Sequence, residues 1–219
     1  MGCVVAVSGA VGGIGTSTFA YALALQAQGG AVLIDAQQGG VALDALLGME
    51  QEAGTRWSQV RIRSDAIDAV SILQALPRRG HVAVLSADGD ATADANAVHV
   101  LAKVLAPVVD LVVVDVPLMH PIRAGLPSDL RMLLTPPTVL GVAATLRVPI
   151  DADLVVVDTG NADVPVRLVG DYLQREIRGR IRWQSAVSSA ASACVAPPPN
   201  TDCMRLAQSI WMALNDRSR

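Results

Sequence analysis

Lysine is almost absent from this chain of 219 residues. Lys103 is the only lysine, so arginine supplies nearly all of the 17 basic side chains. The 20 acidic residues give a formal net charge of −3 at pH 7. That balance argues against a large basic face of the kind that nucleic acids require. We therefore expect no nucleic-acid partner.

Cysteines and long apolar runs are also scarce. Cys3, Cys194 and Cys203 are widely spaced and form no CxxC pair, so we expect neither a zinc site nor a disulfide framework. No run of about 18 uncharged apolar residues occurs, so we expect no membrane-spanning helix. The residues after Met1 include neither a basic segment nor a small-residue cleavage site, so we expect no signal peptide. These absences indicate free thiols in a cytoplasmic chain.

The chain is rich in short β-branched runs that alternate with Ala- and Leu-rich stretches. Its hydrophobic content of 52% comes from Ala and Val along the whole length, as in buried parallel strands and the helices that cover them. Strands are predicted at residues 4–8, 31–35, 82–86, 111–115, 131–135 and 154–158, with an edge strand at 178–183. Helices are predicted at residues 17–28, 41–47, 65–76, 93–105, 139–146, 166–174 and 205–215, with a turn at 78–80 and a loop at 185–200. The pattern predicts one α/β domain over residues 1–219, with a single doubly wound, mostly parallel sheet and helices on both faces.

A glycine-rich segment, SGAVGGIGTST, occupies residues 8–18 between the first predicted strand and the first helix. Glycines let the backbone turn sharply there. The N terminus of the following helix offers free N–H groups and a positive dipole end, which favour a phosphate. We predict a phosphate-binding loop made by Gly12, Gly13, Ile14, Gly15, Thr16, Ser17 and Thr18.

One resemblance of this segment is to the phosphate loop of short-chain dehydrogenases, through Gly9-x-x-x-Gly13-Ile14-Gly15. Asp35, at the end of the second strand, would suit a ribose contact. Those enzymes also need a Tyr-x-x-x-Lys pair, but neither Tyr21 nor Tyr172 is followed by lysine at that spacing. An active dehydrogenase is excluded, while a non-catalytic dinucleotide-binding regulator stays open as an alternative.

The same segment resembles the deviant Walker A loop of MinD/ParA-type P-loop proteins, K-G-G-x-G-K-(S/T)-(S/T). The resemblance continues through VLIDAQQGGVALDALLG at residues 32–48, LVVVDVP at 111–117 and LLTPPTVLGVAATLR at 133–147. Trp57 and the run LPRRG at residues 76–80 resemble the CpaE-like, or TadZ-like, branch in particular. Order and spacing match over nearly the whole chain and imply a P-loop NTPase-like fold.

The cationic residues of that motif are missing, so the Walker A loop is degenerate. The lysine that bridges the β- and γ-phosphates is replaced by Thr16, and the second lysine of the deviant motif by Val11. Gln37 aligns with the acidic residue that positions the attacking water, and glutamine orients a water in some GTPases. Loss of such charge typically costs about 10²-fold or more in rate per group. We therefore expect little or no ATP hydrolysis.

The remaining residues are coherent for binding. The resemblance implies that the loop holds ATP or ADP, with Mg²⁺ near Ser17, Asp35 and Asp115. The family's base-recognising asparagine is not matched cleanly by Asp158 or Asn161, so the identity of the base stays open. A site that is empty in cells is an equal alternative.

The CpaE-like resemblance implies a homodimeric, non-hydrolysing scaffold that positions or assembles a Tad-type pilus or secretion apparatus, or the septum. Such a protein would be cytoplasmic and reach the pole or septum through its partners. A slow ATP-dependent dimerisation switch is the alternative. Many relatives carry a receiver-like domain ahead of the P-loop, which we expect to be absent or trimmed here. The C-terminal helix, with Leu206, Ile210 and Leu214 on one stripe, is predicted to pack on the sheet, so membrane association is at most peripheral.

Overall fold

The computed structural model describes residues 2–37, 42–62, 67–88, 91, 93–119, 122, 125–147 and 151–217. The strands are β1 (Cys3–Gly9), β2 (Ala31–Asp35), β3 (Arg78–Arg79), β4 (Val82–Leu85), β5 (Leu111–Asp115), β6 (Leu130–Thr135), β7 (Asp153–Asp158) and β8 (Ile177–Arg182). The α-helices are α1 (Thr16–Ala24), α2 (Leu43–Leu46), α3 (Ala69–Ala75), α4 (Ala95–Leu105), α5 (Val139–Leu146), α6 (Val166–Leu173), α7 (Ser185–Ser192) and α8 (Asp202–Arg217). Two 3-10 turns, η1 (Trp57–Gln59) and η2 (Ala106–Val108), complete the described elements.

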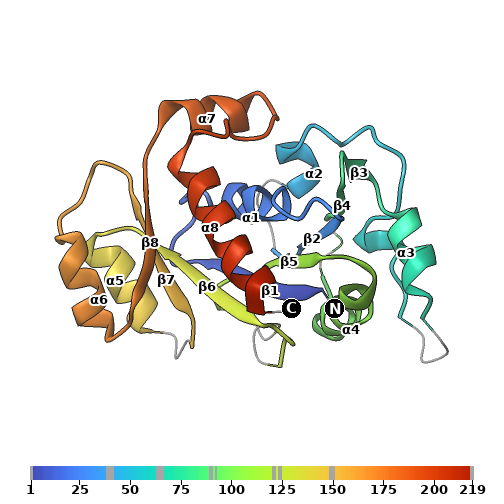
Figure 1. Ribbon diagram of the computed structural model, residues 1–219, viewed down its shortest axis with the longest axis horizontal. Helices are drawn as coiled ribbons and strands as arrows, with labels where there is room; N and C mark the ends of the chain where they lie inside the picture. Colours follow the sequence, from blue (N-terminus) through green and yellow to red (C-terminus); the bar gives the residue numbers. More distant parts are fainter. Residues whose placement is uncertain are drawn as a thin grey trace.

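The strands form one eight-stranded sheet in the order β3-β4-β2-β5-β1-β6-β7-β8 (Figure 1). Adjacent strands are parallel, except for the short antiparallel pair of β3 and β4. β5 lies between β1 and β2, and its Asp115 is in register with Val7 and with Asp35. The carboxyl ends of these three parallel strands therefore lie side by side, with Asp35 and Asp115 on neighbouring strands.

This strand order decides against the dinucleotide-binding alternative. In the dinucleotide-binding fold the second strand lies beside the first. Here β1 pairs with β5 and β6, whereas β2 pairs with β4 and β5. The interpretation of the glycine loop as the phosphate loop of a dehydrogenase-like fold is therefore wrong, because an inserted strand separates β1 from β2.

Helices cover both faces of the sheet (Figure 1). On one face α1, α2 and α8 pack around a buried cluster that includes Phe19, Leu43 and Ile210. On the other face α3 and α4 cover the half formed by β4, β2 and β5, and α5 and α6 cover the half formed by β6 and β7. The predicted fold class, a doubly wound and mostly parallel sheet with helices on both faces, is confirmed.

Several local predictions differ from the structure. Residues 185–200, predicted as a loop, contain α7, an Ala- and Ser-rich helix in which Ala190 is the buried member. Arg78 and Arg79, predicted as part of a turn, form β3 and pair with β4. α2 and α3 are shorter than the predicted helices at 41–47 and 65–76, and residues 41, 65 and 66 lie outside the described chain.

The C-terminal helix packs on the sheet as predicted. Ala207, Ile210 and Leu214 of α8 are buried, and α8 lies against α1 and β8. Within the described ranges, no helix combines the length and the hydropathy needed to cross a bilayer.

Candidate functional site

The glycine loop connects β1, which ends at Gly9, to α1, which begins at Thr16. Gly13 and Gly15 have φ angles of +73° and +88°, a left-handed conformation that glycine adopts without strain. Gly15 is the N-cap of α1, where no side chain caps the helix and no acidic residue lies in the first turn. The first N–H groups of α1 are therefore available to an anion, as the sequence predicts.

A cleft of about 740 Å³ opens over this loop. Uncharged groups from four segments line it, namely Gly9, Ala10, Val11, Gly12, Gly13, Gly15, Thr16, Ser17, Thr18, Gln37, Leu46, Pro117, Leu118 and Met119. Of the described residues that line the cleft, none carries a positive charge. Lys103 lies on α4, which packs on the face of the sheet opposite α1. Any phosphate bound here would be held by backbone N–H groups and hydroxyls.

Thr16, the residue at the Walker A lysine position, closes the base of the loop. A Cβ built on Gly9 would lie 2.2 Å from Thr16 Oγ1 and 3.1 Å from Ile14 Cγ2. A side chain at residue 9 would therefore displace Thr16, which explains the glycine at this position. Thr16 packs across the start of the loop and brings no charge to the cleft.

Asp115 lies buried beneath the cleft at the end of β5. Its Oδ1 accepts a hydrogen bond of 2.7 Å from Gln37 Nε2, and the Ser17 hydroxyl lies beside the carboxyl group. Its Oδ2 is a buried oxygen without a hydrogen-bond partner among the described residues. Burial raises the pKa of Asp115 to about 6, against the opposing effects of Ser17 and Gln37.

Asp35 has a different environment, although it is the neighbour of Asp115 across the sheet. Its Oδ1 accepts from Gln37 N at 3.0 Å and its Oδ2 from Leu43 N at 3.0 Å. Burial raises the pKa of Asp35, while these backbone N–H groups lower it. Both oxygens of the Asp35 carboxylate thus accept hydrogen bonds from the backbone of the segment after β2, and these bonds hold that segment in place.

The three residues predicted around Mg²⁺, Ser17, Asp35 and Asp115, therefore have different roles. Ser17 and Asp115 fit such an ion, because the Ser17 hydroxyl at the helix start lies beside the Asp115 carboxyl group, whose Oδ2 has no hydrogen-bond partner among the described residues. The geometry does not support Asp35 as a ligand. Over the residues that the structure describes, no group of three or more His, Cys, Asp or Glu side chains forms a metal cage. A Mg²⁺ ion would therefore take most of its ligands from phosphate and water, as this ion commonly does.

A buried ion pair behind the cleft was not predicted. Arg56 Nε donates to Asp44 Oδ2 at 2.9 Å, and Arg56 also donates to the carbonyl groups of Gly54, Met49 and Glu52. Asp44 is only 8% exposed, because α2 turns its side chain toward Arg56 and toward Ser86, which follows β4. The only local sequence signal was the neighbouring Trp57, whose Nε1 donates to the Asp35 carbonyl at 2.6 Å.

A second pocket, of about 300 Å³, adjoins the other side of the glycine loop. It shares Gly13, Gly15 and Thr18 with the cleft. Its remaining wall is mostly apolar and comes from the ends of β6, β7 and β8 with α1, α7 and α8, namely Ile14, Phe19, Leu134, Val157, Thr159, Ile181, Arg182, Trp183, Gln184, Val187, Ser188, Ala191 and Cys203. Burial raises the pKa of the Cys203 thiol to about 12, so this thiol is neutral. The lining residues come from segments far apart in the chain, so no local sequence pattern indicated this pocket.

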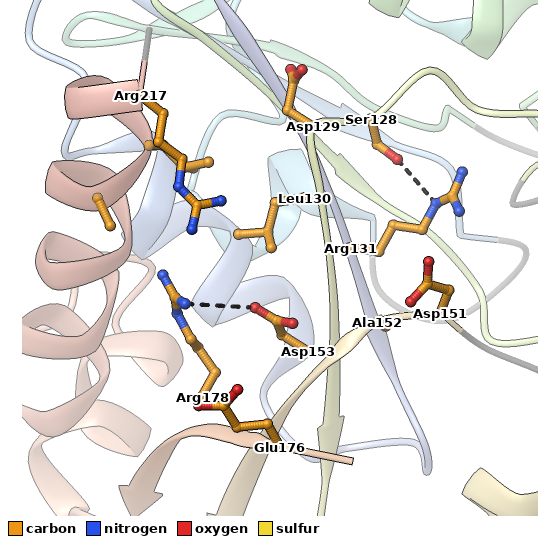
Figure 2. A pocket seen from close by; sticks show the side chains of 12 residues that line it. Ser128, Asp129, Leu130, Arg131, Asp151, Ala152, Asp153, Glu176, Arg178 and Arg217 are labelled. Carbon is orange, nitrogen blue, oxygen red and sulfur yellow. Dashed lines mark hydrogen bonds and ion pairs between the residues drawn. The ribbon is translucent and has the colours of Figure 1, made fainter. Parts of the chain in front are cut away.

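A separate hollow of about 450 Å³ lies at the opposite ends of the strands, where β6, β7 and β8 begin and α8 ends. Figure 2 shows the side chains that line it. Arg178 and Arg217 point into it from β8 and α8 (Figure 2). Arg178 Nη1 lies 3.9 Å from Asp153 Oδ2. The hollow has both acidic and basic side chains and shares no lining residue with the cleft. The candidate site is therefore assigned to the glycine loop and its two adjoining pockets.

No family model matches this sequence. A segment of 85 residues, 39% of the chain, is 40% identical to uncharacterized proteins from two strains of Mycobacterium tuberculosis. The match spans 24% of the length of each of those proteins.

Solved structures match over almost the whole chain. A ParA family ATPase from Chlorobium tepidum superposes with a TM-score of 0.81 at 13% identity, over 98% of this chain and 99% of that one. The MinC:MinD cell division complex of Aquifex aeolicus gives 0.69 at 18% identity, over 94% of both chains. The septum site-determining protein MinD of Pyrococcus horikoshii, complexed with Mg-ADP, gives 0.72 at 16% identity, over 100% of this chain and 98% of that one. The chain therefore has the fold of the ParA/MinD family of P-loop ATPases.

Proposed function

We propose that this protein is a nucleotide-binding scaffold of the ParA/MinD fold that does not hydrolyse ATP at an appreciable rate. The observation that carries the proposal is the cleft over the glycine loop, whose described lining has the glycine backbone of a phosphate site and no cationic side chain. Its cellular role, by its CpaE-like resemblance, is to position or assemble a Tad-type pilus or secretion apparatus, or the septum.

Nucleotide binding is supported by the loop backbone. Gly13 and Gly15 hold the left-handed turns, and the uncapped N terminus of α1 offers its N–H groups and the positive end of the helix dipole. Ser17 and the unpartnered Asp115 Oδ2 would hold Mg²⁺ and its waters beside the phosphates. Bound Mg²⁺ would supply the positive charge that the missing lysines do not. The Mg-ADP complex of the similar MinD structure agrees with this choice of ligand.

Weak or absent hydrolysis follows from the same residues. Charge that develops on the transferred phosphoryl group needs fixed cations, and neither Thr16 nor Val11 supplies one. Gln37 does line the cleft, but one of its two side-chain N–H groups is already donated to Asp115. Its carbonyl oxygen and its second N–H remain to orient a water by hydrogen bonds, and they are the basis of the second candidate function, a slow ATP-dependent dimerisation switch.

The partners in this proposal are a second copy of the chain and proteins of the pilus, secretion or septum machinery. The similar MinD structure in complex with MinC provides the precedent for a protein partner on this fold. We expect the protein to be cytoplasmic and to reach the pole or septum through these partners.

Titration calorimetry tests the proposal directly. The protein should bind ATP and ADP with Mg²⁺ and should not bind NADPH more tightly, because the sheet is not a dinucleotide-binding one. ATP turnover should stay at the level of a Gly15→Val variant that circular dichroism shows to be folded. Turnover of about 1 s⁻¹, an ordinary enzyme rate, would refute a non-hydrolysing scaffold. Slow turnover that Gly15→Val abolishes would favour the switch.

A further inference from the structure

The pocket of about 300 Å³ beside the glycine loop is placed to receive the organic part of a phosphorylated ligand. Gly13, Gly15 and Thr18 line both this pocket and the cleft. A ligand whose phosphates lie on the loop therefore extends into the pocket without leaving the protein surface. The side chains of the pocket then decide which organic groups bind there.

The floor of the pocket gives no polar contact. Leu134, Val157 and Ile181 end three adjacent strands, and each is less than 9% exposed. Phe19 and Cys203 close the floor from α1 and α8. Such a floor favours a flat apolar ring system and selects it only by size and shape.

The two polar side chains of the wall that have a fixed pattern of donors or acceptors each make contacts with Asp202. The Arg182 guanidinium donates to Asp202 Oδ2 at 2.7 Å, and Gln184 Oε1 accepts from Asp202 N at 2.7 Å. Asp158, at the end of β7, accepts from Gly160 N and pairs with Arg180. None of these groups offers a free donor–acceptor pair that would match one base edge and reject another.

The polar groups that remain in the wall are the hydroxyls of Thr18, Thr159 and Ser188, together with the amide nitrogen of Gln184 and the unengaged N–H groups of Arg182. None of these five side chains is buried. A hydroxyl both donates and accepts, and it rotates to suit its partner. It therefore meets the 6-amino group of adenine and the 6-oxo group of guanine equally well. Strong discrimination needs a buried polar group that one ligand leaves unpaired, and the described wall contains none.

Trp183 supplies the one large flat surface at the pocket. It follows β8, and its backbone N–H donates to the Asp158 carbonyl at 2.7 Å, which fixes the start of this turn. Its side chain is 59% exposed, so one side of the indole is free to cover a ring that enters the pocket. Stacking on an aromatic ring tolerates any base, because every base has a π-face.

We propose that this pocket holds the base of the bound nucleotide by stacking on Trp183 and by contact with its apolar floor, and does not discriminate adenine from guanine. The inference rests on the proposed function, because it requires a nucleotide on the glycine loop. It makes the protein a general purine-nucleotide binder and assigns its affinity for the base to Trp183.

The test is calorimetry with three probes, Mg-ATP, Mg-GTP and Mg-tripolyphosphate, on the full chain and on Trp183→Ala. Tyr172→Ala is the matched control, because Tyr172 is an aromatic side chain of similar exposure, 61%, on α6 outside the pocket. ATP and GTP should bind within about threefold of each other. Trp183→Ala should weaken both by about fivefold or more, the loss expected for one stacked base, and should leave tripolyphosphate binding unchanged. Tyr172→Ala should change none of the three.

The probes distinguish the possible failures. If tripolyphosphate binds but ATP is preferred over GTP by more than about thirtyfold, a specific base contact exists, as such a ratio requires roughly 2 kcal/mol of discrimination, and this inference is refuted while the proposed function stands. If both nucleotides bind and Trp183→Ala has no effect on either, the role of Trp183 is refuted. If no probe binds, the proposed nucleotide site fails and this inference fails with it.

Discussion

Replacing Asp115 by asparagine should stabilise the folded protein at neutral pH. Asp115 is buried, its Oδ2 has no hydrogen-bond partner among the described residues, and burial raises its pKa to about 6. A carboxyl group whose pKa is higher in the folded state binds its proton more tightly there than in the unfolded chain. The free energy of unfolding therefore falls as pH rises from about 4 to about 6, and stays low above that range.

The size of the effect follows from the pKa. The pKa rises from 3.8 to about 6, and one pKa unit corresponds to about 1.4 kcal/mol. Ionisation of Asp115 thus lowers the free energy of unfolding by about 3 kcal/mol near neutral pH, but by only about 1 kcal/mol near pH 4.5. Asparagine avoids this cost, because it is uncharged and its carbonyl can still accept the hydrogen bond from Gln37. For a protein of this size the gain corresponds to a rise in Tm of roughly 6–12 °C.

Thermal and urea unfolding of the nucleotide-free protein, measured near pH 4.5 and near pH 7.5, provides the assay. Other carboxyl groups also make the stability depend on pH, because the pKa of Asp35 is raised and the pKa values of Asp68, Asp158 and Asp202 are lowered. The measured quantity is therefore the difference in stability between variant and wild type at each pH. Asp216→Asn, at an exposed position of α8, is the control. A gain that is equal at both pH values, or a loss of stability at neutral pH, would refute the reasoning.

Two further predictions concern the loop and the ion pair behind it. Thr16→Lys should tighten ATP binding by about tenfold or more in calorimetry, because a lysine–phosphate contact contributes roughly 1.5–3 kcal/mol. Unchanged affinity in a folded variant would show that the loop does not hold phosphates. Arg56→Met should lower the free energy of unfolding by about 3–5 kcal/mol in urea, because it leaves Asp44 buried and unpaired. The exposed control Arg61→Met should change it by less than about 0.5 kcal/mol, and equal effects of the two variants would contradict the assigned role of Arg56.

The central strands were predictable from local sequence because each is a continuous apolar run. The predicted strands at residues 31–35 and 111–115 have the bounds of β2 and β5. Both runs end in an aspartate and are buried on two faces. Their short length and their β-branched residues favour strands over helices. The glycine loop was predictable for a similar reason, since its function depends on adjacent residues.

Features that depend on distant residues were not predictable. α7 has the sequence SAVSSAAS and buries only Ala190 among its residues, so it shows no apolar stripe to identify it as a helix. β3 pairs with β4 through backbone groups that any residue carries. Asp44 resembles a surface acid until the fold brings Arg56 to it. The pocket beside Trp183 forms from six separate elements, whose proximity is set by the order of the strands.

The sheet ends at β8, and this edge has a consequence for how copies of the protein associate. Arg178, Arg180 and Arg182 are exposed along the strand, and each lies within ion-pair distance of an aspartate of the same chain. A second β8 placed alongside would bring these rows of guanidinium groups together and disturb the pairs that neutralise them. Pairing of two β8 strands from different copies is therefore unfavourable at this edge of the sheet.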